Sequence, residues 1–313
     1  MIAQIALSVI FFVSLLIFRF PGPAPSLPPA AALSFRSLGA AEQKIPSETG
    51  LGDLGLEAES VYILDLTENK TLYEKNALEV RPLASLTKLM TALLLEEKVP
   101  AGFFIPVSRE AIRQEGDDGF RAGEKFRKED LIDIILVASS NDAAYAAAEF
   151  VGAGLEGGEE ASVSRFVALM NERARELGLL KTSFLNANGL DTEINFKKIP
   201  GANGTAFEIA RLLEFIFKNQ PELIERARSE EFEIVSDQGR RLKAKNTNQA
   251  LADIPQLIAA KTGFTDLAGG NLVFIFDAGF SRPVLVSILG SSEEGRFLDA
   301  KKIVNAVLAY YAL

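Results

Sequence analysis

The chain has 313 residues, 48% of them hydrophobic, with a net charge of −9 and neither a histidine nor a cysteine. This composition is typical of a folded protein, and the acidic surplus argues against nucleic acid as a general partner, because phosphate binding needs a surplus of Lys and Arg. The chain cannot build a Ser-His-Asp triad, a histidine zinc site, a disulfide or a thiol nucleophile. Any acid–base chemistry must therefore use Lys, Glu, Asp, Tyr or Ser.

The N-terminus opens with an uncharged apolar run over residues 2–18, IAQIALSVIFFVSLLIF. Its length is at the lower limit for a membrane-spanning helix and slightly above that of a usual signal-peptide core. We expect residues 1–18 to be an export signal or an N-terminal membrane anchor, placing the rest of the chain in the periplasm or on the outer face of the cytoplasmic membrane. Residues 19–57, which are rich in Pro, Ala, Ser and Gly, are predicted to be a linker to one folded domain over residues 58–313.

The predicted domain starts with a hairpin and a helix. SVYILDL (60–66) and TLYEK (71–75) are strand-like runs separated by a turn. ASLTKLMTALLLEE (84–97) has apolar residues at the spacing of an amphipathic helix. Lys88 interrupts its apolar run one turn after Ser85, among small neighbours.

The middle of the chain is predicted to be helical and the last third to return to strands. Helical patterns cover 129–139, 142–152, 163–179 and 205–219, with Asp142 as a predicted N-cap and Gly178 closing the third helix. Three strand-like runs linked by short turns indicate an antiparallel meander, and a final helix (298–313) is expected to cover one sheet face. This order predicts an α+β fold, an antiparallel β-sheet flanked by helices with an all-α subdomain.

Ser85 and Lys88 form an S-x-x-K pattern. A serine hydroxyl needs a base to become a useful nucleophile, and a lysine whose pKa is lowered by burial can serve as that base. The i, i+3 spacing on a helix brings the two side chains within reach of one another, and a helix N-terminus offers free N–H groups to developing negative charge.

Two further clusters carry chemistry only in combination with the first. Ser139, Ser140 and Asn141 form an S-x-N between two helices, where a hydroxyl could relay a proton and an amide could hold a carbonyl, although helix capping explains such residues equally well. Lys261, Thr262 and Gly263 lie on a predicted strand, where a cation and a hydroxyl can bind a carboxylate and a glycine allows close approach.

The ordered set S-x-x-K, S-x-N and K-T-G resembles the penicillin-recognising serine enzymes. The blocks LYEKNALEVRPLASLTKLMTALL, ILVASSNDAAYAAAE, FLNANGLD, NTNQAL and AAKTGFTDLAGGNLV are similar to those of the low-molecular-weight D-alanyl-D-alanine carboxypeptidases of peptidase family S11. The resemblance covers roughly residues 56–310.

The resemblance implies an acyl transfer without metal or cofactor. Ser85 would attack the carbonyl between two terminal D-alanines and Lys88 would accept its proton, while N–H groups of Ser85 and Phe264 form the oxyanion hole. Ser139 would relay the proton to the leaving D-alanine. Substrate binding would fall to Asn141, Lys261, Thr262 and Gly263, in addition to Phe264.

The implied substrates are peptidoglycan stem peptides ending in D-Ala-D-Ala, with β-lactams as inhibitors and the membrane as a partner if the N-terminal segment is uncleaved. A family block that often begins with His is Asn188, Gly189, Leu190 and Asp191 here, and we expect this loop to be structural. We also expect no C-terminal β-rich domain.

Three alternatives share these motifs. A class A-like β-lactamase would need an E-x-x-L-N pattern between S-x-N and K-T-G, and the sequence has none. A non-catalytic β-lactam sensor would be expected to lack motif residues or to carry a signalling domain. A DD-endopeptidase acting on cross-links would differ in the breadth of its pocket, which the sequence does not show.

Overall fold

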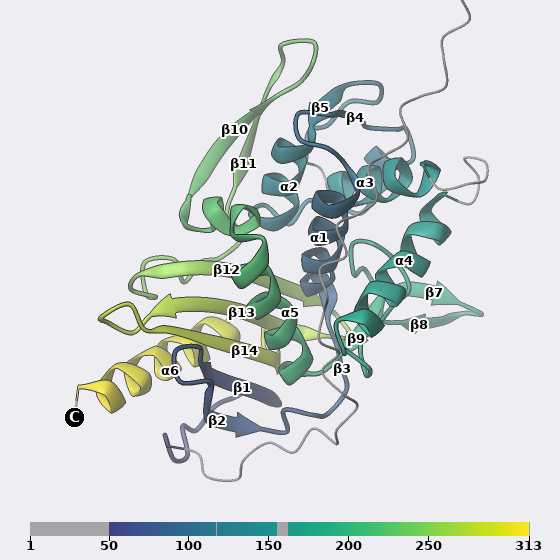
Figure 1. Ribbon diagram of the computed structural model, residues 1–313. Helices are drawn as coiled ribbons and strands as arrows, with labels where there is room; N and C mark the ends of the chain where they lie inside the picture. Colours follow the sequence, from purple (N-terminus) through teal and green to yellow (C-terminus); the bar gives the residue numbers. More distant parts are fainter. Residues whose placement is uncertain (1–49, 117, 155–161, 313) are drawn as a thin grey trace, which may run out of the picture. The chain divides into compact units, whose positions relative to one another are not determined.

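The computed structural model describes residues 50–116, 118–154 and 162–312 (Figure 1). The predicted signal or anchor, residues 1–18, and the greater part of the predicted linker lie outside these residues. Of the helices in the described ranges, none has both the length and the apolar character needed to cross a bilayer.

One five-stranded sheet forms the centre of the domain, in the order β12-β13-β14-β1-β2 with every neighbouring pair antiparallel. Its strands are β1 (Ser60–Asp65), β2 (Lys70–Lys75), β12 (Leu257–Thr265), β13 (Gly269–Asp277) and β14 (Pro283–Ser291). The predicted N-terminal hairpin and the predicted C-terminal meander are both confirmed. The hairpin and the meander join where β1 pairs with β14. Strand β12, which carries the K-T-G residues, therefore lies at one edge of the sheet.

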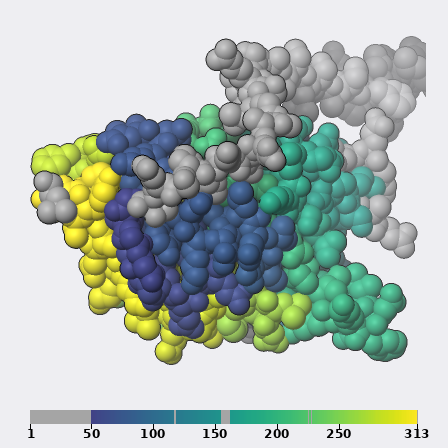
Figure 2. All heavy atoms as spheres, turned by 90° about the horizontal axis from the view of Figure 1, so that it is seen from below, coloured from purple at the N-terminus to yellow at the C-terminus, as the bar shows by residue number. Residues whose placement is uncertain are grey.

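The two faces of this sheet bury different side chains, because successive residues of a strand point to opposite faces. Tyr62 and Leu64 pack into the core that the sheet shares with the helices of the middle of the chain. Val61 and Ile63 pack into a second core under α6 (Gly295–Tyr311). The expected final helix covering one face is confirmed, and Figure 2 shows it in yellow beside the first strands in purple.

The other face carries the helices, which confirms the predicted α+β class. They are α1 (Lys88–Lys98), α2 (Lys128–Leu136), α3 (Asn141–Ala153), α4 (Ser162–Glu176) and α5 (Ala206–Asn219). α5 lies directly on β14 and β1, whereas α1, α2 and α3 pack on one another. Gly178 has a φ of +75° just after α4, as expected of a residue that ends a helix.

Short elements connect these layers. The 3₁₀ helices are η1 (Ala84–Thr87), η2 (Ala111–Arg113) and η4 (Pro221–Arg228), and the short strands are β3 (Arg81–Pro82), β4 (Phe104–Pro106), β5 (Lys125–Arg127), β6 (Ser183–Phe184), β7 (Thr192–Ile194), β8 (Lys197–Ile199), β9 (Ala202–Gly204), β10 (Glu231–Val235) and β11 (Arg241–Lys245). None of these short strands was predicted. Those from β3 to β9 have only two or three residues, which carry no periodic signal, whereas β10 and β11 have five residues each and form a separate two-stranded hairpin.

Two local predictions need correction. The helix predicted from residue 84 starts as the 3₁₀ turn η1 and becomes α-helical only at Lys88. Asp142 is not the N-cap of α3: the cap is Ser140, whose Oγ accepts a hydrogen bond from Ala143 N at 3.0 Å. Asp142 lies in the first turn instead, where a carboxylate is favoured by the helix dipole.

Candidate active site

The start of the helical segment formed by η1 and α1 brings a serine and a lysine together. Ser85 lies in η1 and Lys88 begins α1, so their spacing of three residues places Lys88 Nζ 2.8 Å from Ser85 Oγ. Lys88 is fully buried, whereas Ser85 remains partly accessible. Ser85 is therefore the more accessible of the two residues, and the amine of Lys88 is enclosed.

Lys88 contacts only neutral oxygens. Besides Ser85 Oγ, its Nζ donates to Asn141 Oδ1 at 2.8 Å and to the main-chain oxygen of Asn188 at 2.9 Å. Burial lowers the pKa of Lys88 to about 7, and the charge of Asp118 partly opposes this effect. Near neutral pH a large fraction of the amine is therefore uncharged and able to accept a proton.

The backbone around Ser85 is held tightly from two sides. Ala84 has a φ of +48°, which is unusual for a residue with a side chain. A Cβ on Gly189 would lie 1.9 Å from the Ala84 oxygen, and a Cβ on Gly263 would lie 3.2 Å from Ser85 N. Glycines at these two positions thus let the loop before β7 and the strand β12 press against the turn that carries Ser85.

The turn between α2 and α3 supplies the second cluster. Ser139 has a φ of +62°, and Ser140 caps α3 while donating to Asp118 Oδ2 at 2.5 Å. Asn141 accepts from Lys88 and donates through Nδ2 to the Glu115 oxygen at 2.7 Å. The capping function and the contact with Lys88 therefore belong to different residues of the same S-x-N.

Strand β12 supplies the third cluster. Lys261 is buried and its Nζ donates to Ser139 Oγ at 2.8 Å and to the Thr262 oxygen at 2.9 Å. Burial, followed by the charge of Lys88, holds the pKa of Lys261 well below its usual range. Thr262 shares a hydrogen bond of 2.6 Å with Thr247, and the Phe264 side chain is 43% exposed.

Arg296, in the first turn of α6, is a further residue of the site that was not predicted from the sequence. Its side chain is buried and NH1 donates to the Gly263 oxygen at 2.7 Å, while the guanidinium lies 6.0 Å from the centroid of the Phe264 ring. Burial lowers the pKa of Arg296. Across the described ranges no carboxylate lies within salt-bridge distance of Lys88, Lys261 or Arg296. Lys261 and Arg296, two buried basic side chains without an ionic partner in these ranges, favour an anionic ligand.

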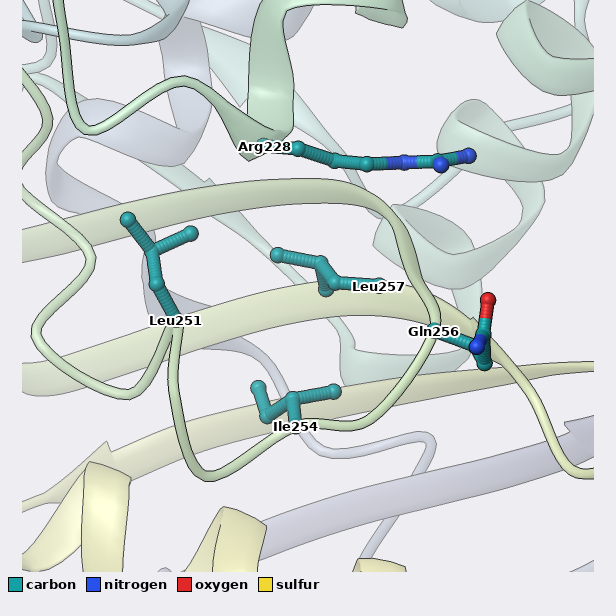
Figure 3. A pocket seen from close by; sticks show the side chains of 5 residues that line it. All are labelled: Arg228, Leu251, Ile254, Gln256 and Leu257. Atoms are coloured by element: carbon teal, nitrogen blue, oxygen red, sulfur yellow. The ribbon is translucent and has the colours of Figure 1, made fainter.

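A separate hollow lies at the start of β12 (Figure 3). It has a volume of about 240 Å³ and is lined by Arg228, Leu251, Ile254, Gln256 and Leu257. None of these residues belongs to the three clusters, and Leu257 precedes Lys261 by four residues, or roughly 13 Å along a strand. The hollow is therefore not part of the candidate active site.

The profile of the D-alanyl-D-alanine carboxypeptidases, peptidase family S11, matches residues 45–291. The chain belongs to this family. The S11 match spans the described domain from before β1 to the end of β14.

Individual relatives agree with the S11 assignment. D-alanyl-D-alanine carboxypeptidase DacF of Bacillus subtilis (strain 168) is 29% identical over 265 residues, which cover 83% of this chain and 64% of that relative. The chain thus matches less than two thirds of that protein's length. Penicillin-binding protein D2 of Listeria monocytogenes, solved in its ampicillin-bound form, is 29% identical with a TM-score of 0.64 and 81% and 98% coverage of the two chains. The Streptomyces K15 DD-transpeptidase shares the fold, with a TM-score of 0.72 at 24% identity and the same coverage.

In this S11 member the structure brings the predicted site residues into one place. Ser85, Lys88 and Asn141 are linked directly by hydrogen bonds, and Ser139 is linked to Lys261. Thr262, Gly263 and Phe264 follow on the same strand, and Gly263 adjoins Ser85. The loop containing Asn188, expected to be only structural, also reaches the site, since its main-chain oxygen accepts from Lys88.

Proposed function

We propose that this protein is a serine-type D-Ala-D-Ala carboxypeptidase that removes the terminal D-alanine of peptidoglycan stem peptides. The observation that carries the proposal is the buried amine of Lys88, 2.8 Å from Ser85 Oγ and surrounded by neutral oxygens. The family membership and the named relatives support the same activity.

The contacts of Lys88 define the direction of proton transfer. A neutral amine has two N–H groups and one lone pair, and the oxygens of Asn141 and Asn188 can only accept. Both N–H groups therefore point to these oxygens, and the lone pair is left facing Ser85, whose hydroxyl becomes the donor. Lys88 is thereby oriented as the general base for Ser85.

In the acylation step Ser85 Oγ forms a bond to the carbonyl carbon between the two D-alanines. The serine proton passes to Lys88, and N–H groups of Ser85 and Phe264 stabilise the oxyanion. The C–N bond then breaks as the leaving amine takes the proton that Lys88 accepted, relayed through Ser139, which accepts a hydrogen bond from Lys261. Lys88 is thereby neutral again. Water attacks the resulting ester and returns the enzyme to its starting state.

The anionic end of the substrate matches the cationic side of the site. Lys261, Thr262 and Arg296 surround the place where a terminal carboxylate would lie, and Arg296 has no carboxylate partner among the described residues. Its buried Nε also lacks a hydrogen-bond partner there. Arg296 is thus added to the substrate-binding residues Asn141, Lys261, Thr262, Gly263 and Phe264.

The same serine would be acylated by β-lactams, which carry a carboxylate and a strained amide. Action on the cell wall places the domain outside the cytoplasm, in the periplasm or at the outer face of the cytoplasmic membrane. The N-terminal apolar segment would export the chain and, if uncleaved, attach it to the membrane.

The test is the intact mass of the full-length chain incubated with benzylpenicillin, beside a Ser85→Ala variant. We expect one lasting penicilloyl group on the wild-type protein and none on the variant. Release of D-alanine is then measured from a peptide ending in D-Ala-D-Ala, with a matched peptide ending in L-Ala-L-Ala as the control.

Other outcomes would assign a different function. Loss of penicillin without a lasting adduct would favour the β-lactamase alternative. A lasting adduct without release of D-alanine from either the peptide or a cross-linked dimer would favour a sensor. Cleavage of the dimer in preference to the linear peptide would favour a DD-endopeptidase.

A further inference from the structure

The loop of residues 186–191 lies between the two halves of the proposed catalytic apparatus. Asn186 locks it internally, because its Oδ1 accepts from Gly189 N at 2.7 Å and its Nδ2 donates to the Leu190 oxygen at 2.8 Å. In this conformation Asn188 offers its main-chain oxygen to Lys88, and Gly189 lies against Ala84. The first part of the loop therefore contacts the residues on both sides of Ser85.

The last residue of the loop, Asp191, contacts the opposite side of the site. Its Oδ1 accepts from Thr265 Oγ1 at 3.0 Å and its Oδ2 accepts from Leu267 N at 3.2 Å. The Asp191 side chain is only 4% exposed, and Lys198 Nζ lies 3.9 Å from Oδ2. A buried carboxylate with two donors and a nearby cation is a fixed contact rather than a solvated surface group.

Thr265 is the last residue of β12 and directly follows Phe264. Since β12 is an edge strand, only β13 pairs with it within the sheet. Asp191 supplies a hold on the end of β12 from outside the sheet. Because the same 186–191 loop contacts Lys88 and Ala84, it connects the end of β12 to the turn that carries Ser85.

We propose that Asp191 is a positioning residue that fixes the end of β12, and with it the Phe264 N–H, at the correct separation from Ser85. The inference rests on the proposed function, because it concerns the oxyanion hole of that reaction. Small displacements of an oxyanion donor matter: loss of one such donor slows the chemical step about 10²–10³-fold. A displaced donor is weakened rather than removed, so the expected loss is about 10- to 100-fold.

The experiment measures acylation of the full-length chain by nitrocefin in stopped flow, over a range of nitrocefin concentrations and of pH. In Asp191→Asn and Asp191→Ala the acylation rate constant should fall by about 10- to 100-fold, while the dissociation constant of the non-covalent complex changes by less than about threefold. The acid limb of the pH profile should stay in place, because Asn186 rather than Asp191 holds the Asn188 oxygen that Lys88 contacts. A general loss of structure would not produce this combination.

Two further variants separate the hydrogen bond between Asp191 and Thr265 from the negative charge of this turn. Asp266→Asn removes a carboxylate from the same turn that is 75% exposed and pairs with Lys198, and it should leave acylation near the wild-type rate. Thr265→Val removes the hydroxyl from which Asp191 accepts and should slow acylation, by no more than Asp191→Ala, which also loses the contact with Leu267 N. The double variant of Asp191→Ala and Thr265→Val should be no slower than Asp191→Ala alone, because Asp191→Ala already removes the hydrogen bond that Thr265→Val removes.

The outcomes distinguish this inference from the proposed function. A wild-type protein that acylates normally beside unchanged Asp191→Asn and Asp191→Ala variants would overturn the positioning role and leave the peptidase assignment intact. An effect confined to the dissociation constant, or equal in Asp266→Asn, would also overturn it. A wild-type protein that nitrocefin does not acylate would overturn both.

Discussion

Two lysines of this protein occupy similar places in the fold and have different surroundings. Lys88 is the first residue of α1 and Lys128 the first residue of α2, and both are almost completely buried. Lys128 Nζ lies 2.7 Å from Glu96 Oε1, whereas Lys88 contacts only neutral oxygens. A helix N-terminus disfavours a cation at both positions. The two buried lysines therefore differ in the type of partner, a carboxylate for Lys128 and neutral oxygens for Lys88.

The strongest test of this contrast is Lys88→Met. Without the base, acylation of Ser85 by benzylpenicillin should fall by about 10³–10⁴-fold, as measured by the rate of adduct formation in intact mass spectra. The melting temperature should change little, because the gain from removing an amine that must be desolvated opposes the loss of the donor to the Asn141 and Asn188 oxygens. Lys128→Met is the matched control and should acylate within about threefold of the wild-type rate. Equal losses in both variants would mean that burial rather than the partner determines the role of the lysine.

Arg296 extends the contrast to a buried guanidinium. Arg296→Leu should lower the second-order rate constant of acylation by about 10- to 100-fold, because a charge-assisted hydrogen bond to the ligand carboxylate is lost. Release of D-alanine from the carboxylate-terminated peptide is the measurement, and a C-terminally amidated peptide is the control. The amidated peptide should be poor for both proteins. A variant that loses the same factor on both peptides would assign Arg296 to folding rather than to binding.

Lys128→Met should show its effect in stability. Removing the lysine leaves Glu96, whose side chain is 21% exposed, without its ion-pair partner. We expect the free energy of unfolding in urea to fall by about 1–3 kcal/mol. Lys88→Met, measured in the same urea titration, should lose less stability than Lys128→Met. A Lys128→Met protein as stable as the wild type would show that the ion pair with Glu96 does not stabilise the fold.

The smallest expected effect is a shift in pH dependence. Because the neutral amine is the base, acylation should have an acid limb near the Lys88 pKa of about 7, with the rate falling as pH decreases below it. The Asp118 carboxylate raises the pKa of Lys88. Asp118→Asn should therefore lower it and move the limb to lower pH, by less than about one pH unit. A shift to higher pH would contradict this electrostatic account.

Much of the architecture could be predicted from local patterns. The hairpin over residues 60–75, the three C-terminal strands and the main helices follow from hydrophobic periodicity and turn residues. The approach of Ser85 and Lys88 follows from a spacing of three residues on a helical segment. The 3₁₀ start of that segment could not be predicted, since it depends on Gly189 and Gly263 pressing against the turn.

The rest of the site depends on contacts between distant segments. Asn188 acts through its main-chain oxygen, which any residue possesses, so no side-chain pattern marks it. Arg296 contacts a carbonyl that lies 33 residues earlier in the chain, and in the sequence it is one more basic residue near a helix start. Lys261 could be assigned to anion binding from its residue type, but its hydrogen bond to Ser139 requires the packing of β12 against the turn before α3.

The left-handed backbone at Ala84 and Ser139 has a consequence for how this protein tolerates change. Each such residue costs on the order of 1–3 kcal/mol that the surrounding contacts must offset. Ala84 directly precedes Ser85, and Ser139 is one of the site residues. Because glycine adopts a positive φ without strain, variants selected for thermal stability alone would be expected to accumulate glycine at these two positions. Such proteins would melt later and acylate more slowly. The two positions where a glycine would relieve backbone strain are therefore also positions on which the activity depends.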